Sequence, residues 1–157
     1  MKFSVQREVF ELNKEIINYW DEFRKSQDPT LPVEVEAFQF GADADWLAEL
    51  VMDGKKTATC SAHVLYELEG ETIPHVGQYN IVLNSKEMPV AVIRITDVSL
   101  VPMNEVPEEF ALAEGEGDYD YWWTAHKQFF SQELEVHGLS YAENLLLVCE
   151  RFEVVYK

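Results

Sequence analysis

Apolar side chains recur every three or four residues between positions 5 and 25, which is the spacing of one face of an α-helix. The apolar positions are Val5, Val9, Leu12, Ile16, Tyr19, Trp20 and Phe23. Two prolines within residues 28–32 then end the pattern, because proline cannot continue the helical hydrogen-bond ladder. We therefore predict an amphipathic N-terminal helix over residues 5–25.

Short apolar or alternating segments dominate the rest of the chain and predict strands separated by short helices. Residues 35–40 alternate in polarity, and Asp43 or Asp45 can cap a helix that ends near Gly54. The remaining elements are predicted as strands at 79–83, 90–101, 145–149 and 152–156, a short helix or turn at 63–68, a short helix within 104–113 and a longer helix from Asp118. Few of these segments follow a regular β-α-β order. We predict an α+β fold whose mixed or mostly antiparallel sheet curls into a small barrel.

Composition places these elements in one acidic globular unit. The 157 residues suffice for one domain, and the hydrophobic fraction of 47% excludes disorder. Lysine and arginine total 12 against 29 acidic residues, so the net charge is −17 and repels polyphosphate. A small ligand such as a nucleoside fits this charge better than a long RNA. Without a signal-peptide core or a run of membrane-spanning length, we expect a soluble cytoplasmic protein.

The cysteines and histidines do not show the spacing of metal ligands. Cys60 and Cys149 lie in apolar, strand-like runs and are expected to be buried, reduced thiols. The histidines have no ligand spacing, and no phosphate-binding glycine loop or G-x-S-x-G motif is present. The sequence therefore predicts neither a metal site nor a bound cofactor.

The segment Gly54-Lys55-Lys56-Thr57-Ala58-Thr59-Cys60-Ser61 concentrates positive charge in an otherwise acidic chain. No other basic residue occurs between Lys25 and Lys86. Hydroxyl groups at Thr57, Thr59 and Ser61 follow the lysine pair in alternation. This combination suggests a site for an anionic or carbonyl-bearing ligand. The alternative is a strand that begins with two solvated lysines, since exposed lysine is the usual case.

The order of several motifs resembles the ASCH domain, a compact β-barrel related to the PUA domains of RNA-modifying proteins. The resemblance covers residues 35–157 and treats residues 1–34 as an N-terminal helical extension of the kind seen in larger bacterial members. It is carried by residues 47–51, 54–59, 74–77, 114–118, 122–126, 129–130 and 148–152. The implied organisation is one globular unit, with the extension packed on the ASCH domain.

The resemblance implies two kinds of function. Some ASCH proteins hydrolyse amide-linked acyl groups from modified cytidine nucleosides, using a lysine, a threonine and a downstream glutamate. The matching residues here are Lys56, Thr59 and Glu114, with Glu116 as the nearby alternative to Glu114. Other members have been proposed as RNA-binding modules, and a nuclease activity has been reported. The expected partner is thus a nucleoside-like small molecule or, alternatively, RNA bound without catalysis. A third reading is a structural or regulatory protein with an unused pocket.

Two catalytic assignments are open from the sequence. Lys56 can take the proton of the Thr59 hydroxyl, or it can polarise the substrate carbonyl while Glu114 activates a water. Both assignments need Lys56 and Thr59 on one side of the backbone, although residues three apart in a regular strand point to opposite faces. We therefore predict that the backbone departs from strand geometry between Lys55 and Thr57.

The aromatic residues near the candidate site could either pack in the hydrophobic core or contact a ligand. Trp122 and Trp123 are adjacent, so a narrow helical stripe cannot bury both, and one of them is a candidate platform for a base. Tyr66 is a further candidate. His126 is read chiefly as a packed, hydrogen-bonded residue. The candidate ligand-binding set is Lys55, Thr57, Ser61, Tyr66, Glu116, Trp122, Trp123 and His126, and Asp118 is expected to cap the following helix.

Overall fold

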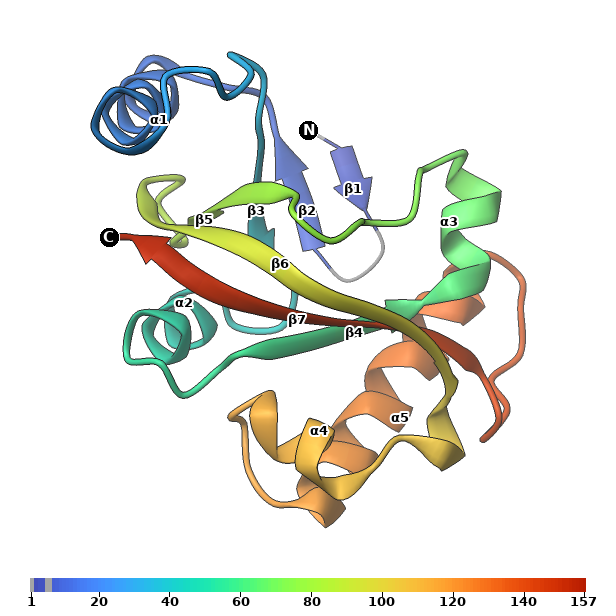
Figure 1. Ribbon diagram of the computed structural model, residues 1–157. Coiled ribbons are helices and arrows are strands. Elements are labelled where there is room, and N and C mark those ends of the chain that lie inside the picture. The colour runs from blue at the N-terminus through green and yellow to red at the C-terminus, as the bar shows by residue number, and fades with distance from the viewer. Residues whose placement is uncertain (1, 5–6) are drawn as a thin grey trace.

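A seven-stranded sheet with helices on both faces forms the fold (Figure 1). The computed structural model describes residues 2–4 and 7–157. In spatial order the strands are β1 (Lys2–Ser4), β2 (Arg7–Phe10), β3 (Glu36–Phe40), β5 (Tyr79–Leu83), β6 (Pro89–Pro102), β7 (Leu146–Tyr156) and β4 (Ala58–Ala62). The helices are α1 (Lys14–Gln27), α2 (Ala44–Met52), α3 (His63–Glu69), α4 (Glu108–Ala113) and α5 (Tyr119–Val136), with a 3₁₀ turn at Met103–Glu105.

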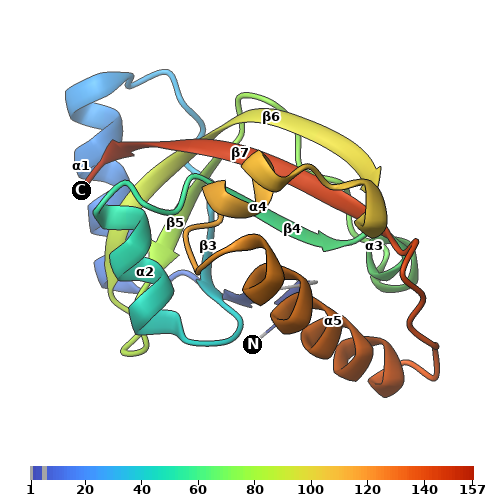
Figure 2. The same ribbon diagram turned by 90° about the horizontal axis from the view of Figure 1, so that it is seen from below.

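The sheet is mixed and strongly curved. Strands β3 and β5 are parallel, and the other neighbouring pairs are antiparallel. The long strands β6 and β7 carry register shifts at Val92/Ile93 and Ile95/Asp97, where bulges increase the local bend. Figure 2 shows the resulting half-barrel, with β6 and β7 arching over β3, β4 and β5. The α+β class and its barrel-like sheet are confirmed.

The N-terminal helix is shorter than predicted, and a strand precedes it. Residues 7–10 form β2 and pair with β3, whereas residues 5 and 6 lie outside the described residues. Helix α1 begins only at Lys14, where the Asn13 side chain accepts a hydrogen bond from the Ile16 N–H and caps the helix. Pairing with β3 satisfies the backbone of residues 7–10, so it overrides an apolar spacing that fits a helix equally well.

Helices α1 and α2 cover opposite faces of the sheet. Ile16, Trp20 and Phe23 of α1 pack on Ala37, Ile81 and Val92. Leu47, Leu50 and Val51 of α2 pack instead on Phe38, Val82 and Ile93, which are the next residues along the same strands. Successive strand residues point to opposite faces, so this alternation defines the two layers. The N-terminal segment thus adds a helix to one face and two strands to the edge.

A third apolar cluster joins α3, α4 and α5 to strands β4 and β7. Its largest buried members include Leu65, Phe110, Trp122, Phe130 and Leu147. Asp43 and Asp118 cap α2 and α5 as expected, each accepting a hydrogen bond from a backbone N–H three residues later. Figure 2 shows α2 and α5 on either side of the loop that joins α4 to α5. No helix in the described ranges is long and apolar enough to cross a membrane.

Candidate functional site

The lysine-threonine segment reaches the site through a turn followed by a strand. Helix α2 ends at Met52, and Gly54 takes a positive φ of 74° that reverses the chain. Strand β4 begins only at Ala58, so Lys55–Thr57 precede the regular strand. This departure from strand geometry is the one predicted from the sequence. It lets Lys56 and Thr59 line the same cavity, although they are three residues apart.

The loop after α4 lies directly against this segment. The Thr57 N–H donates a 2.8 Å hydrogen bond to the carbonyl oxygen of Ala113, the last residue of α4. Gly115 then takes a φ of +77°, and a Cβ at this position would lie 2.5 Å from the carbonyl oxygen of Lys55. Only glycine permits both this conformation and this approach. The close contact brings the Glu114 side chain against Lys56.

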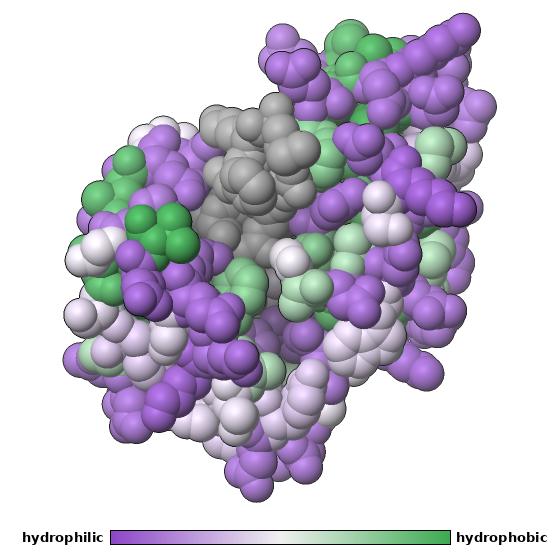
Figure 3. All heavy atoms as spheres, turned by 180° about the vertical axis from the view of Figure 1, so that it is seen from behind, coloured by the Kyte–Doolittle hydropathy of each residue, from purple (hydrophilic) through white to green (hydrophobic). Residues whose placement is uncertain are grey.

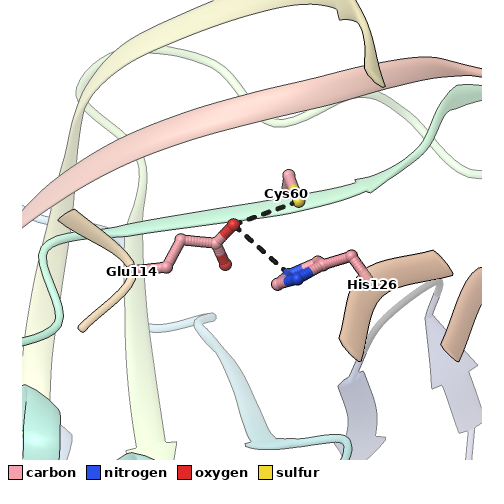
Figure 4. Close-up of side chains that lie close together, drawn as sticks. All are labelled: Cys60, Glu114 and His126. Atoms are coloured by element: carbon pink, nitrogen blue, oxygen red, sulfur yellow. Dashed lines mark hydrogen bonds and ion pairs between the residues drawn. The ribbon is translucent and has the colours of Figure 1, made fainter. Parts of the chain in front are cut away.

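Glu114 is buried and accepts hydrogen bonds from four side chains. Its Oε1 lies 3.4 Å from Lys56 Nζ. Its Oε2 accepts a 2.6 Å hydrogen bond from Trp122 Nε1 and a 3.2 Å hydrogen bond from Cys60 Sγ, and it lies 3.3 Å from His126 Nε2. Figure 4 shows the approach of Cys60 and His126 to this carboxylate. With 1% of its side chain exposed, Glu114 is shielded from solvent and satisfied within the protein.

The hydrogen-bond geometry favours a protonated His126. Nδ1 lies 2.8 Å from the carbonyl oxygen of Trp122, an acceptor only, so Nδ1 carries a hydrogen. Nε2 faces the carboxylate of Glu114, which also only accepts when ionised, so Nε2 carries the second hydrogen. With Glu114 ionised, these contacts favour the imidazolium form of His126. Burial alone would lower the pKa of His126, but the charge of Glu114 raises it above its ordinary value.

The same contacts keep Glu114 ionised. Burial would raise the pKa of this carboxyl group, but the charges of His126 and Lys56 and the hydrogen bonds from His126 and Trp122 lower the pKa to about 2. A carboxylate with so low a pKa is a weak base at neutral pH. Glu114 is suited to orienting the two cations rather than to accepting protons.

A second carboxylate approaches Lys56 from the cavity side. Glu116 Oε2 lies 3.6 Å from Lys56 Nζ, and 15% of the Glu116 side chain is exposed. Lys56 thus contacts two carboxylates, the buried Glu114 and the partly exposed Glu116, and both line the cavity. Glu116 is partly buried at the site rather than solvated in an open turn.

The cavity measures about 280 Å³ and has a charged floor with aromatic walls. Figure 3 shows a hollow near the centre of the rear face, with hydrophilic atoms at its floor. The principal lining residues are Phe40, Asp43, Trp46, Leu47, Lys56, Thr59, Glu114, Glu116, Tyr121, Ala125, His126 and Phe129. They come from four stretches of the chain: the end of β3 with the start of α2, the turn before β4 with the start of β4, the α4–α5 loop, and α5. Segments far apart in the sequence therefore build the cavity.

Residues 36–156 match the ASCH domain family. This chain belongs to the ASCH domain family. It is 41% identical to the ASCH domain from Lactobacillus crispatus JV V101, with a TM-score of 0.74 over 77% of this chain and 79% of that one. It is 39% identical to a crystallised protein from Enterococcus faecalis V583, with a TM-score of 0.83 over 91% of this chain and 89% of that one. Comparison with curated proteins gave no match.

All three predicted catalytic residues of this ASCH domain meet at the cavity, but most of the predicted ligand-binding residues do not line it. Lys56, Thr59 and Glu114 line it together with Glu116 and His126. The other candidates lie elsewhere: Lys55 is exposed, Thr57 bonds to Ala113, Ser61 bonds to Tyr66 within the apolar core, Trp122 lies behind Glu114, and Trp123 packs against the core. Of the three alternating hydroxyls, only that of Thr59 lines the cavity, because Thr57 precedes β4 and Ser61 bonds to Tyr66.

Sequence reasoning missed the aromatic residues that do line the cavity of this ASCH domain. Trp46 of α2 is 38% exposed and lies at the cavity. Tyr121 and Phe129 of α5 and Phe40 of β3 also line it. Helical spacing gives no signal for Trp46, because its neighbours Leu47, Leu50 and Val51 supply the buried face.

Cys60, Glu114 and His126 bring three potential metal-ligand atoms within 4.8 Å of one another. Zinc needs a thiolate and a neutral imidazole, but burial raises the pKa of the Cys60 thiol well above its ordinary value. The His126 nitrogen that faces the cluster also carries a hydrogen. The Lys56 ammonium, 3.4 Å from the same carboxylate, further disfavours a cation there. The geometry favours a hydrogen-bonded cluster over a metal centre.

Proposed function

We propose that this ASCH domain is an amidohydrolase that removes an amide-linked acyl group from N4-acylated cytidine-type nucleosides. The observation that carries the proposal is the meeting of Lys56, Thr59 and Glu114 at one cavity. An ammonium group, a hydroxyl group and a carboxylate are sufficient for acyl transfer when their geometry is fixed. The resemblance to amidohydrolase members of the family supplies the substrate class.

The size and charge of the cavity support a small, nearly neutral ligand. A volume of about 280 Å³ lies at the lower end of ordinary small-molecule sites. The floor combines two cations, Lys56 and His126, with two carboxylates, Glu114 and Glu116. Such a balanced floor can hold a polar amide without requiring a net ligand charge.

Lys56 suits the role of polarising the acyl carbonyl. Its side chain is 2% exposed, and contacts with Glu114 and Glu116 hold the ammonium group at the cavity. A fixed ammonium group in a water-poor site stabilises the negative charge that develops on the carbonyl oxygen during attack. Lys56 is therefore the electrophilic residue in the proposal, and Glu114 orients it.

Thr59 is the proposed nucleophile, with Glu116 as its base. Within the described part of the chain, the Thr59 hydroxyl has no hydrogen-bond partner. Its oxygen would attack the acyl carbon while Glu116 takes its proton. Cleavage of the C–N bond then releases the amine, to which Glu116 returns the proton. Water hydrolyses the resulting ester, releases a carboxylic acid and restores Thr59.

The alternative function, non-catalytic RNA binding, has less support. Lys56 is buried, and Arg94 and Arg151 are paired with Glu153 and Glu109. With a net charge of −17, the remaining exposed lysines face a strong opposing field. A continuous basic stripe is what RNA binding requires. The small-molecule reading needs no such stripe.

The test is incubation of the purified protein with N4-acetylcytidine, with free cytidine and acetate measured by chromatography. Turnover by the wild-type protein, and its loss in Lys56→Met, supports the proposal. Lys55→Met is the matched control, because Lys55 is exposed and lies outside the cavity. Absence of turnover on acylated cytidines, together with salt-sensitive binding of single-stranded RNA, would favour the alternative.

A further inference from the structure

Two large aromatic side chains remain exposed at the cavity of this protein. Trp46 is 38% exposed and Tyr121 is 48% exposed, although Trp20 and Trp122 are almost completely buried. Both exposed rings line the same cavity that contains Lys56 and Thr59. Large apolar side chains elsewhere on the surface, such as Leu68 and Val136, are also exposed, but they do not line this cavity. The position of the two rings at the cavity, and not their exposure alone, points to contact with a ligand.

The two rings come from different helices that flank the site. Trp46 lies in the first turn of α2 and Tyr121 in the first turn of α5, and the N–H of each donates to a capping aspartate, Asp43 or Asp118. Figure 2 shows these helices on either side of the α4–α5 loop. Helix caps fix both backbone positions, so the rings project from anchored points. Little ordering is needed when a ligand binds between them.

Gly117 further fixes the position of the Tyr121 ring. A Cβ at this glycine would lie 2.9 Å from Tyr121 Cδ1, so the tyrosine ring rests against the bare backbone of the loop. The same short loop carries Glu114 and Glu116, which contact Lys56. The ring and the charged floor are thereby held by one segment. A ligand ring at Tyr121 would therefore lie in the same cavity as Lys56.

We propose that Trp46 and Tyr121 form a stacking site that holds the planar heteroaromatic ring of the ligand, with the ring substituent directed to Lys56. This inference rests on the proposed function for the identity of that substituent as an acylated amine. Recognition of the ring itself depends only on the two aromatic side chains. Stacking on aromatic residues is tolerant of ring identity, because every base has a π-face. The charged floor, by contrast, selects the substituent.

Equilibrium binding of cytidine, measured by calorimetry, tests the ring site separately from catalysis. The variants are Trp46→Leu and Tyr121→Leu, which keep an apolar side chain but remove the ring, and Trp46→Phe and Tyr121→Phe as ring-retaining controls. We expect each leucine variant to bind cytidine on the order of tenfold more weakly, and each phenylalanine variant to stay near wild type. Neither the wild-type protein nor any variant should bind ribose measurably, because ribose has no planar ring.

The outcomes separate this inference from the proposed function. Cytidine binding that requires both rings, without turnover of N4-acetylcytidine, would support the ring site and reject the amidohydrolase. Turnover with an unchanged KM in both leucine variants would reject the ring site and leave the amidohydrolase standing. Failure of the wild-type protein to bind cytidine or N4-acetylcytidine would overturn the ring site outright. Circular dichroism of each variant verifies that the fold is retained.

Discussion

The indole Nε1–H of Trp122 donates a 2.6 Å hydrogen bond to Oε2 of Glu114, between two side chains that are each only 1% exposed. The contact links helix α5 to the loop after α4, and it places a neutral donor on the side of the carboxylate away from Lys56. Hydrogen bonds to a charged partner are stronger than those between neutral groups. Trp122 therefore positions Glu114 instead of stacking on a ligand.

Replacing Trp122 with phenylalanine removes this donor but keeps an aromatic ring in the core. We expect Trp122→Phe to lower the free energy of unfolding by about 1.5–3 kcal/mol, the range for a hydrogen bond to a charged group. Denaturant unfolding measures the change. Trp123→Phe is the matched control, because Trp123 is half-buried and does not contact Glu114. Equal losses in the two variants would show that ring volume, and not the hydrogen bond, matters.

Acid should destabilise the protein through Glu114. Its pKa is lowered on folding from 4.5 to about 2, so its ionised form contributes stability above pH 4.5. That contribution is lost as the pH falls from 4.5 through about 2. The free energy of unfolding measured across this interval should fall steeply in the wild type and less steeply in Glu114→Gln. Glu109→Gln, which alters an exposed ion pair, should retain the steep wild-type slope.

His126 should titrate above its ordinary pKa of 6.5, because Glu114 stabilises the imidazolium. A raised pKa in the folded state means that this contribution to stability is present below pH 6.5 and is lost as the pH rises through the folded pKa. NMR titration of the imidazole resonances measures the value directly. In Glu114→Gln the folded pKa of His126 should fall, since burial then acts against the weaker contributions of Glu116 and the Trp122 carbonyl alone. An unchanged pKa of His126 in this variant would show that Glu114 and His126 do not form an ion pair.

Gly115 should tolerate alanine poorly. Its φ of +77° is strained for an L-residue, and the added Cβ would lie 2.5 Å from the Lys55 carbonyl oxygen. Gly138 has a similar φ of +72° but nothing within 4 Å of an added Cβ. Gly138→Ala should therefore cost about 1 kcal/mol of conformational strain, whereas Gly115→Ala should cost more and also reduce turnover. Comparable thermal unfolding shifts for the two variants would contradict the close approach.

The order of elements could be predicted from the sequence because strong local signals mark it. Asp43 and Asp118 precede apolar helical patterns, and the β-branched run before Val101 forms the long strand β6. The predicted start of the N-terminal helix was wrong, because the apolar Val9 fits the pattern of a strand as well as that of a helix. Only the pairing of residues 7–10 with β3 decides between the two. Long-range strand pairing has no local sequence signal.

The candidate site was predicted only in part. Lys56, Thr59 and Glu114 were found through the family motif, because no local pattern joins residues 58 positions apart in the chain. The roles of Trp122 and Cys60 as donors to Glu114 depend on the packing of α5 against β4, which side-chain spacing does not encode. Trp46 and Tyr121 were missed as ligand-facing residues because exposure depends on the separation of two helices.

Single-turnover hydrolysis of N4-acetylcytidine by Thr59→Val and Lys56→Met tests the central claim most directly, with mass spectrometry to detect an acylated protein. Valine matches threonine in shape without the hydroxyl group, and methionine keeps an unbranched side chain without the ammonium group. We expect the wild-type protein to turn over and to form a transient acyl adduct at Thr59, and the rate to fall at least 10²-fold in each variant. Wild-type rates in both variants would contradict a shared catalytic site at this cavity.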